Sequence, residues 1–266
     1  GRELAEMGMM HQAGAVGFTD DGSGVQDPQV MKRAMKYVSM FDTVIAQHCQ
    51  DDKIARRGVM NSGYWSTVLG LAGLDTLAEE AMLWRDIELV KKTGVRYHAQ
   101  HLSTAGSVDI WRRGRESGLP VSCEVTPHHL LFTDEKCRNY DTRYKVNPPL
   151  RGEEDVAALK EAIREGLVDA LASDHAPHLQ SEKELEFLAA PFGIASLECA
   201  LGLYIKALVE PGVVDWGELV RMMTVGPARI IGIDKGTLGV GKQGDVTVID
   251  AEKSWRVDVN KFRSKS

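Results

Sequence analysis

The chain has 266 residues, of which 43% are hydrophobic and 26% are charged, and its formal net charge is −6. This composition is that of a globular protein with a large core, and it excludes a disordered chain or a coiled coil. No stretch approaches the roughly 18 consecutive apolar residues of a membrane span, and charged residues interrupt the N-terminal region where a signal peptide would be apolar. We therefore predict a cytoplasmic protein with no membrane partner.

The distribution of charged residues indicates the class of partner, and that of the cysteines indicates the redox state of the thiols. The 32 Lys and Arg residues form no basic block beyond the short tail at 261–265, so the composition favours a small-molecule substrate over nucleic acid. The four cysteines are scattered without a CxxC pair, which favours reduced thiols over a disulfide framework.

Short apolar runs recur along the chain, each ending in polar or ionisable residues and each followed by a helical pattern. They lie at residues 13–18, 43–46, 95–99, 120–125 and 167–172. Strands that alternate with helices indicate a parallel α/β architecture, in which functional residues gather at the carboxyl ends of the strands.

The helices between these runs have recognisable ends. Asp27 and Pro28 are typical of an N-cap and a first helical residue, and Ser103-Thr104 can cap a helix that ends at Gly118. A third apolar-periodic stretch at 153–164 stops before Gly166. The intervening segments at 51–73 and 129–151 are expected to be long loops, which are often functional in compact domains.

The C-terminal part has a different pattern. Residues 236–250 combine turn residues with an alternating stretch that predicts a strand, so we place a boundary between residues 1–235 and a small β unit at 236–266. Gly239, Gly241 and Gly244 match the spacing of a dinucleotide fingerprint, but they precede the predicted strand instead of following one. A glycine-rich turn is the better interpretation.

Candidate metal ligands stand at the ends of four predicted strands. His48, His101 and Asp174 end three of them and Asp21 a fourth, so in a parallel barrel they would converge as nitrogen and oxygen donors suited to zinc. A single histidine of this kind is more often structural, and only one of Asp20 and Asp21 should face the site. Cys49 beside His48 could be a nucleophile, but neighbouring strand residues point to opposite faces, which favours a buried thiol.

Several motifs together resemble those of the type I bacterial dihydroorotases of the amidohydrolase superfamily, in order and spacing over nearly the whole chain. The motifs are Phe18-Thr-Asp-Asp-Gly22, Ala46-Gln-His-Cys-Gln-Asp51, Gln100-His-Leu-Ser103, Val125-Thr-Pro-His-His-Leu130, Asn147-Pro-Pro-Leu-Arg151, Ser173-Asp-His-Ala-Pro-His178 and Ala190-Pro-Phe-Gly-Ile194.

The resemblance implies a role for each matching residue. Asp21 would bridge two zinc ions, His48 and His101 would bind the second ion, and Asp174 would bind the first and act as the catalytic base and acid. The substrate would be held by further groups: Asn147, His178, Phe192 and Gly193. A metal-bridging hydroxide would attack the ring amide of dihydroorotate, and ring closure of carbamoyl aspartate in pyrimidine biosynthesis would follow the reverse path.

Two family features are missing from this sequence. The HxHxR signature of the first barrel strand is absent, as is a downstream Asn that helps to hold the substrate carboxylate. The resemblance places Asp21 on the fourth strand, so we expect an incomplete TIM-like (β/α)8 barrel of about strands 4–8 in residues 1–235, with part of a small β domain at 236–266. We therefore expect an N-terminally truncated sequence with little or no turnover from this chain alone.

Three alternatives stay open. Hydantoinase or dihydropyrimidinase and allantoinase share the superfamily barrel, but they usually bridge their metals with a carboxylated Lys, and no Lys occurs between Gly1 and Met31. A non-catalytic dihydroorotase-like scaffold of aspartate transcarbamoylase is disfavoured because every ligand that this stretch should carry is present. The number of zinc ions, a homodimer and a complex with the transcarbamoylase are left open.

Overall fold

The computed structural model describes residues 1–264, and its centre is a five-stranded parallel sheet. The strand order is β1-β2-β5-β6-β7, and each of the five strands predicted from the sequence is present, although β1 and β7 are short. Phe18 lies opposite Ile45, which lies opposite Tyr97 on the next strand. The sheet strands are β1 (Gly17–Thr19), β2 (Val44–Gln47), β5 (Arg96–Ala99), β6 (Val121–Val125) and β7 (Ala170–Leu171).

Helices connect the strands in sequence. The α-helices are α1 (Met7–Gln12), α2 (Pro28–Val38), α3 (Asp52–Ala55), α4 (Tyr64–Leu69), α5 (Leu77–Thr93), α6 (Ala105–Glu116), α7 (Pro127–Leu131), α8 (Glu153–Arg164), α9 (Gln180–Lys183), α10 (Ala200–Tyr204), α11 (Trp216–Met223) and α12 (Val225–Ile231). Short 3-10 turns are η1 (Asp134–Asn139), η2 (Thr142–Tyr144), η3 (Leu197–Cys199) and η5 (Val259–Lys261), and η4 (Ile205–Val209) is a π-helical turn.

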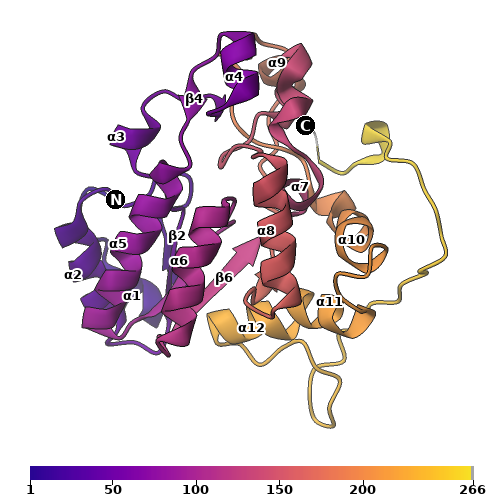
Figure 1. The fold of residues 1–266 in the computed structure, drawn as a ribbon. Helices are drawn as coiled ribbons and strands as arrows, with labels where there is room; N and C mark the ends of the chain where they lie inside the picture. The colour runs from indigo at the N-terminus through magenta and orange to yellow at the C-terminus, as the bar shows by residue number, and fades with distance from the viewer. Residues whose placement is uncertain (265–266) are drawn as a thin grey trace.

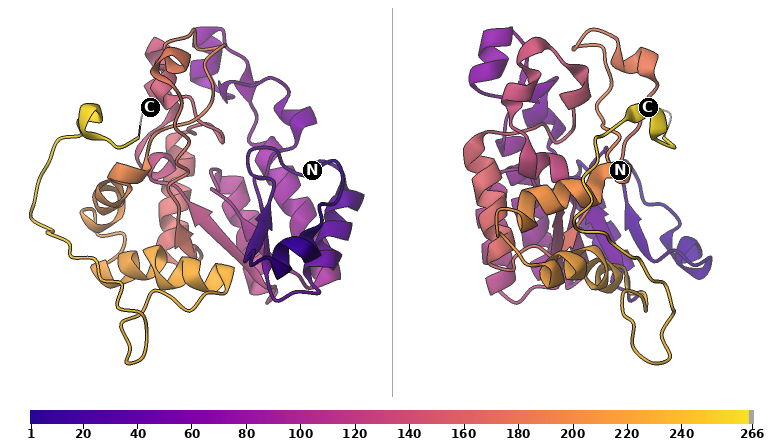
Figure 2. Two further views of the ribbon diagram at one scale, coloured as in Figure 1. Left: turned by 180° about the vertical axis from the view of Figure 1, so that it is seen from behind. Right: turned by 90° about the vertical axis from the view of Figure 1, so that its right-hand side faces the viewer.

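The winding of the sheet is that of a barrel segment. Helix α2 packs on α5, α5 on α6 and α6 on α8, so the helices form one layer over the sheet (Figure 1). From behind, the strands themselves face the viewer (Figure 2, left). A sheet whose strands follow chain order under one helical layer is singly wound, as in a (β/α)8 barrel, whereas a doubly wound sheet reverses its order and carries helices on both faces. The expected incomplete barrel is therefore confirmed in the described part of the chain.

Local sequence explains the helix ends. The Asp27 side chain accepts hydrogen bonds from the backbone N–H groups of Gln29 and Val30, and Pro28 occupies the first helical position of α2. The Thr104 hydroxyl accepts a bond from the Ser107 N–H at the start of α6. Both caps satisfy donors that the first turn of a helix leaves free, so these predictions are confirmed.

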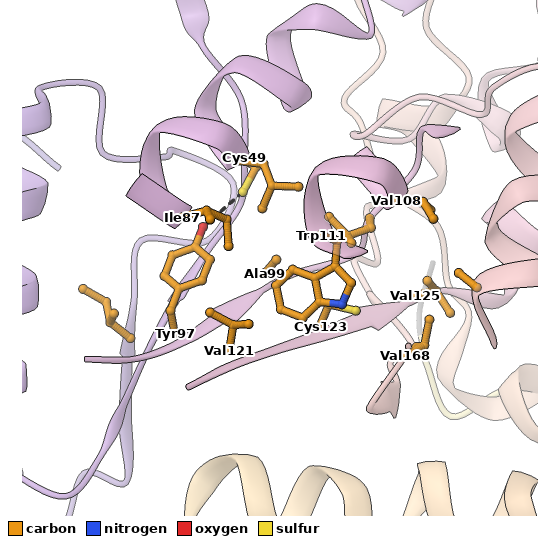
Figure 3. Close-up of a cluster of buried hydrophobic side chains, with 14 of the residues drawn as sticks. Cys49, Ile87, Tyr97, Ala99, Val108, Trp111, Val121, Cys123, Val125 and Val168 are labelled. Carbon is orange, nitrogen blue, oxygen red and sulfur yellow. Dashed lines mark hydrogen bonds between the residues drawn. The ribbon is translucent and has the colours of Figure 1, made fainter. Parts of the chain in front are cut away.

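The main core lies between the sheet and its helices (Figure 3). Trp111 of α6 is buried there, and its indole N–H donates to the Leu167 carbonyl at 3.0 Å. Because side chains alternate along a strand, the buried Tyr97 and Cys123 face this core, whereas His98 and Glu124 point to the other face and pair at 3.1 Å.

Two segments differ from the sequence expectation. The expected loop at 51–73 contains α3, α4 and a small parallel sheet of β3 (Met60–Asn61) with β4 (Gly73–Leu74). The strand expected within 245–250 does not form, since a strand needs a neighbour for its backbone groups and no described segment pairs with this one. Val246 and Val248 are accordingly exposed, and the boundary between 1–235 and 236–266 remains a prediction.

None of the helices within residues 1–264 combines the length and the apolar character needed to cross a membrane.

Candidate metal centre

The carboxyl ends of four sheet strands bring the predicted ligands to one edge of the sheet. Asp21 follows β1, His48 follows β2, His101 follows β5 and Asp174 follows β7. His101 and Asp174 adopt positive φ angles of 32° and 43°. Such a backbone conformation is uncommon outside glycine, and it is frequent where a strand end aims a side chain into a site.

Three of the four predicted metal ligands meet in a compact group. His48 Nδ1 lies 3.0 Å from His101 Nε2, and Asp21 Oδ1 lies 3.5 Å from His101 Nε2 and 3.9 Å from His48 Nδ1. Ligand atoms of a tetrahedral zinc site are separated by about 3.3 Å when the zinc bonds are near 2.0 Å. The two imidazoles and the carboxylate therefore fit a metal ion in both spacing and donor type.

The adjoining aspartate faces elsewhere. The Asp20 carboxylate is not part of this group, and it makes no ion pair or hydrogen bond with His48 or His101 in residues 1–264. The structure thus agrees with the expectation that only one of the two aspartates faces the site.

Electrostatics favours the ligand forms of His48 and Asp21, but it favours the protonated form of His101. Burial, assisted by the charge of His101, lowers the pKa of His48 to about 3, so its imidazole is neutral and offers a lone pair. The hydrogen bond with His101 lowers the pKa of Asp21, which keeps the carboxylate ionised. Burial opposes protonation of His101, but its bond to Asp21 and the charge of Asp174 raise its pKa overall.

Asn147 adds a second observation that fits a metal ion. Its side-chain amide nitrogen lies 3.3 Å from His48 Nε2, while its Oδ1 atom is buried without a hydrogen-bond partner in the described residues. Coordination through His48 Nδ1 would place a proton on Nε2. The Oδ1 atom of a rotated Asn147 amide would then accept a hydrogen bond from that N–H group, so the buried oxygen would gain its partner.

Asp174 stands beside this group and outside its compact core. Its Oδ2 atom lies 3.9 Å from Nε2 of His128, whose ring is neutral because burial lowers its pKa to about 3. Burial raises the pKa of Asp174, although the charge of His101 counteracts it. A carboxyl group with a raised pKa is suited to accept and return a proton near neutral pH.

His128 and His129 lie in the motif at 125–130, but no role was predicted for them from the sequence. Both rings are buried, and His128 has no hydrogen-bond partner on either nitrogen in residues 1–264. His129 bonds to the Thr126 hydroxyl at 2.7 Å and to the Pro148 carbonyl at 2.9 Å. It therefore ties the end of β6 to the segment that carries Asn147, a contact that no sequence pattern reveals.

The remaining predicted site residues, His178, Phe192 and Gly193, contact one another in a second cluster. His178 Nε2 bonds to the Phe192 carbonyl at 2.7 Å, and the Ala176 N–H donates to the Ile194 carbonyl at 3.0 Å. Gly193 has a φ of 142°, and a Cβ there would lie 2.4 Å from the Ala176 carbonyl oxygen. Glycine is thus required for the close approach of these two segments. In the described residues His178 contacts Phe192 and Glu182 and none of the three clustered ligands.

Cys49 is a buried thiol, as expected. Its sulfur lies 3.3 Å from the Tyr97 hydroxyl (Figure 3), and burial raises its pKa well above the usual value. A thiol in this state is a poor nucleophile.

Fold and site together define a partial α/β barrel with a candidate metal-binding group at the carboxyl ends of its strands. The chain belongs to the amidohydrolase family, whose sequence model matches residues 3–264. It is 47% identical over 266 residues to a dihydroorotase of Acetivibrio thermocellus and 49% identical over 265 residues to one of Pelotomaculum thermopropionicum. All of this chain is covered in both comparisons, and it spans 62% of the length of each relative.

A similar solved structure supports the fold. The L-hydantoinase (dihydropyrimidinase) from Arthrobacter aurescens matches with a TM-score of 0.88 and 28% identity, covering 98% of this chain and 61% of that one. The partial barrel predicted from the sequence therefore has a counterpart in this solved structure.

Proposed function

We propose that the whole protein is a zinc-dependent dihydroorotase that interconverts N-carbamoyl-L-aspartate and L-dihydroorotate in pyrimidine biosynthesis. The observation that carries this proposal is the cluster of Asp21, His48 and His101, whose donors fit a metal ion. The identity of 47–49% to curated dihydroorotases over the entire chain supports the choice of substrate. Two zinc ions, a cytoplasmic location and association with itself or with aspartate transcarbamoylase belong to the same proposal.

The residues of this chain would share the chemistry as follows. Asp21, His48, His101 and Asp174 would hold zinc, which supplies an activated water with a pKa of about 7 and polarises the amide carbonyl. Asp174 would take a proton on its carboxylate and pass it to the leaving ring nitrogen, since burial already raises its pKa. Asn147 and His178, with the backbone at Phe192 and Gly193, would bind and orient the substrate.

A second candidate is a hydantoinase or dihydropyrimidinase. The solved structure of the Arthrobacter aurescens L-hydantoinase matches almost the whole chain. The position of Asp21 argues for the first proposal, because its carboxylate already lies where the two histidines converge.

The test is hydrolysis by the purified whole protein, offered dihydroorotate, hydantoin, dihydrouracil and allantoin in parallel. We expect turnover of dihydroorotate alone, together with its synthesis from carbamoyl aspartate. Turnover of hydantoin without dihydroorotate would refute the proposal.

A variant pair tests the role of Asp174. Asp174→Asn should lower kcat by at least about a hundredfold, as expected for loss of a general base. Asp109→Asn, which neutralises an exposed aspartate of α6, should leave kcat unchanged. Equal activity of the two variants would exclude Asp174 as the proton carrier.

A further inference from the structure

A buried lysine joins two of the segments that flank the candidate site. The Lys145 side chain is buried, and its ammonium group donates to the carbonyls of Phe187 at 2.6 Å, Leu188 at 3.2 Å and Ala190 at 2.6 Å. The ammonium also lies 4.8 Å from the centre of the Phe192 ring. All three donors of the charged group are thus used on one loop, residues 184–193, which follows α9.

A second lysine donates hydrogen bonds to the other end of the same loop. Lys183, at the end of α9, donates to the carbonyls of Pro191 at 3.0 Å and Gly193 at 2.9 Å, with a longer contact to the Lys145 carbonyl at 3.4 Å. The Gly193 N–H donates in turn to the Lys145 carbonyl at 2.9 Å. The two lysines and the loop therefore form one connected set of hydrogen bonds.

This arrangement is electrostatically costly. Neither ammonium has a carboxylate within ion-pair distance in residues 1–264. Carbonyl dipoles compensate both positive charges, and the ring faces of Phe187 and Phe192 also compensate that of Lys145. Burial lowers the pKa of Lys145, and burial with the charge of Lys145 lowers the pKa of Lys183 to about 8, against an opposing effect of Asp141. Buried charges without ion partners are expensive, so their presence here needs a reason beyond filling space.

The reason lies in the two segments that the hydrogen bonds of Lys145 and Lys183 join. Asn147 lies two residues after Lys145 and reaches His48 at 3.3 Å. At the other end, Phe192 and Gly193 contact His178 and the segment after β7. The loop has little regular structure of its own. Phe187 and Ala190 are buried, whereas Leu185 and Leu188 are exposed, so apolar packing holds only part of it.

We propose that Lys145 and Lys183 form a two-lysine clamp that positions the 187–193 backbone against Asn147 and so shapes the substrate-binding side of the metal centre. The lysines are positioning residues, because they reach the site through Asn147 and Gly193. The kinetic consequence of the clamp rests on the proposed function, whereas its structural consequence does not.

The kinetic experiment uses Lys145→Met and Lys183→Met in the whole protein, since methionine keeps the length of the side chain and removes the donors. Each variant should raise KM for dihydroorotate by about tenfold or more, because each loses hydrogen bonds from a charged donor. The kcat and the zinc content should stay near those of the parent, since the metal ligands are untouched. Lys183→Arg should recover most of the loss.

The structural experiment is digestion with an endopeptidase that cleaves after glutamate, because Glu184 and Glu186 are exposed in the loop. Cleavage at these two sites should be faster in both methionine variants than in Lys92→Met, which removes an exposed lysine of α5. If Lys145→Met fails to fold, the half-buried Lys183 and its two variants carry the comparison.

The outcomes separate the two proposals. Cleavage no faster than in Lys92→Met, or a fall in kcat with an unchanged KM, would overturn the clamp. An inactive parent protein would overturn the proposed function instead, and the digestion would still decide whether the clamp exists.

Discussion

Removing one partner of a buried ion pair near the metal centre should destabilise the protein far more than removing one partner of a surface ion pair. The guanidinium of Arg151 donates to Asn61 Oδ1 and to the Leu74 carbonyl, both at 3.1 Å, and to the Ser103 hydroxyl at 3.1 Å. Glu79 accepts the Ser103 N–H at 3.0 Å and lies 3.8 Å from Arg151 Nη2. The side chains of Glu79 and Arg151 are only 3% and 1% exposed.

The perturbation is Glu79→Gln, which keeps the shape and removes the charge. It leaves the Arg151 guanidinium buried without its counter-ion, a change that costs about 3–5 kcal/mol of the free energy of unfolding. The matched control on the same helix is Glu88→Gln. Glu88 pairs with Lys91 on the surface, where the side chains are 40% and 39% exposed, so its loss should cost less than about 1 kcal/mol.

Urea unfolding of the whole protein, followed by fluorescence and circular dichroism, measures both changes. The double variant Glu79→Gln with Arg151→Met should regain part of the lost stability, since no unpaired charge remains buried. Ser103 lies two residues after His101, so Glu79→Gln should also weaken metal binding. A cost for Glu79→Gln within about 1 kcal/mol of the cost for Glu88→Gln would refute the reasoning, because exposed pairs are worth no more than that.

Three further predictions follow from the site and its support. Asp21→Asn should lower zinc affinity by about tenfold or more in a competitive chelator titration, since it removes the charged oxygen of the ligand group, whereas Asp20→Asn should leave it unchanged. Tyr204→Phe should cost about 1–3 kcal/mol in urea unfolding, because the buried hydroxyl donates at 2.6–2.7 Å to carbonyls at the ends of β6 and β7; a neutral result would show that water replaces it. Burial raises the pKa of Asp86 from 3.8 to about 6, so the folded state binds the proton more tightly than the unfolded state does. The free energy of unfolding of the parent should therefore fall as pH rises from 4 to 6. Relative to Asp86→Asn, the fall should be at most about 3 kcal/mol. Parallel pH profiles of the two proteins would contradict that assignment.

Local sequence patterns were enough to predict the strands of the sheet and the start of α2. The five strand positions follow from apolar runs of the right length, and the start of α2 follows from Asp27 and Pro28, because a strand face and a helix cap depend on neighbours a few residues away. The same reasoning predicts that Asp21, His48, His101 and Asp174 converge, since parallel strands bring their carboxyl ends to one edge, and the first three of them lie in one compact group. The roles of Asp174 and His178 in catalysis and binding remain predictions.

Other features depend on contacts between distant segments, and no local pattern encodes them. The strand expected within 245–250 has the right alternation but finds no partner among the described residues, so its backbone stays unpaired. Arg151 and Glu79 are 72 positions apart and become a buried pair only when the 51–74 segment folds over them. A lysine such as Lys145 is expected on the surface from its residue type alone. It is buried because three carbonyls of a loop more than 40 residues away converge on its ammonium group. Composition and periodicity report what a residue prefers on average, whereas burial of a charge depends on which partners the folded chain brings to it.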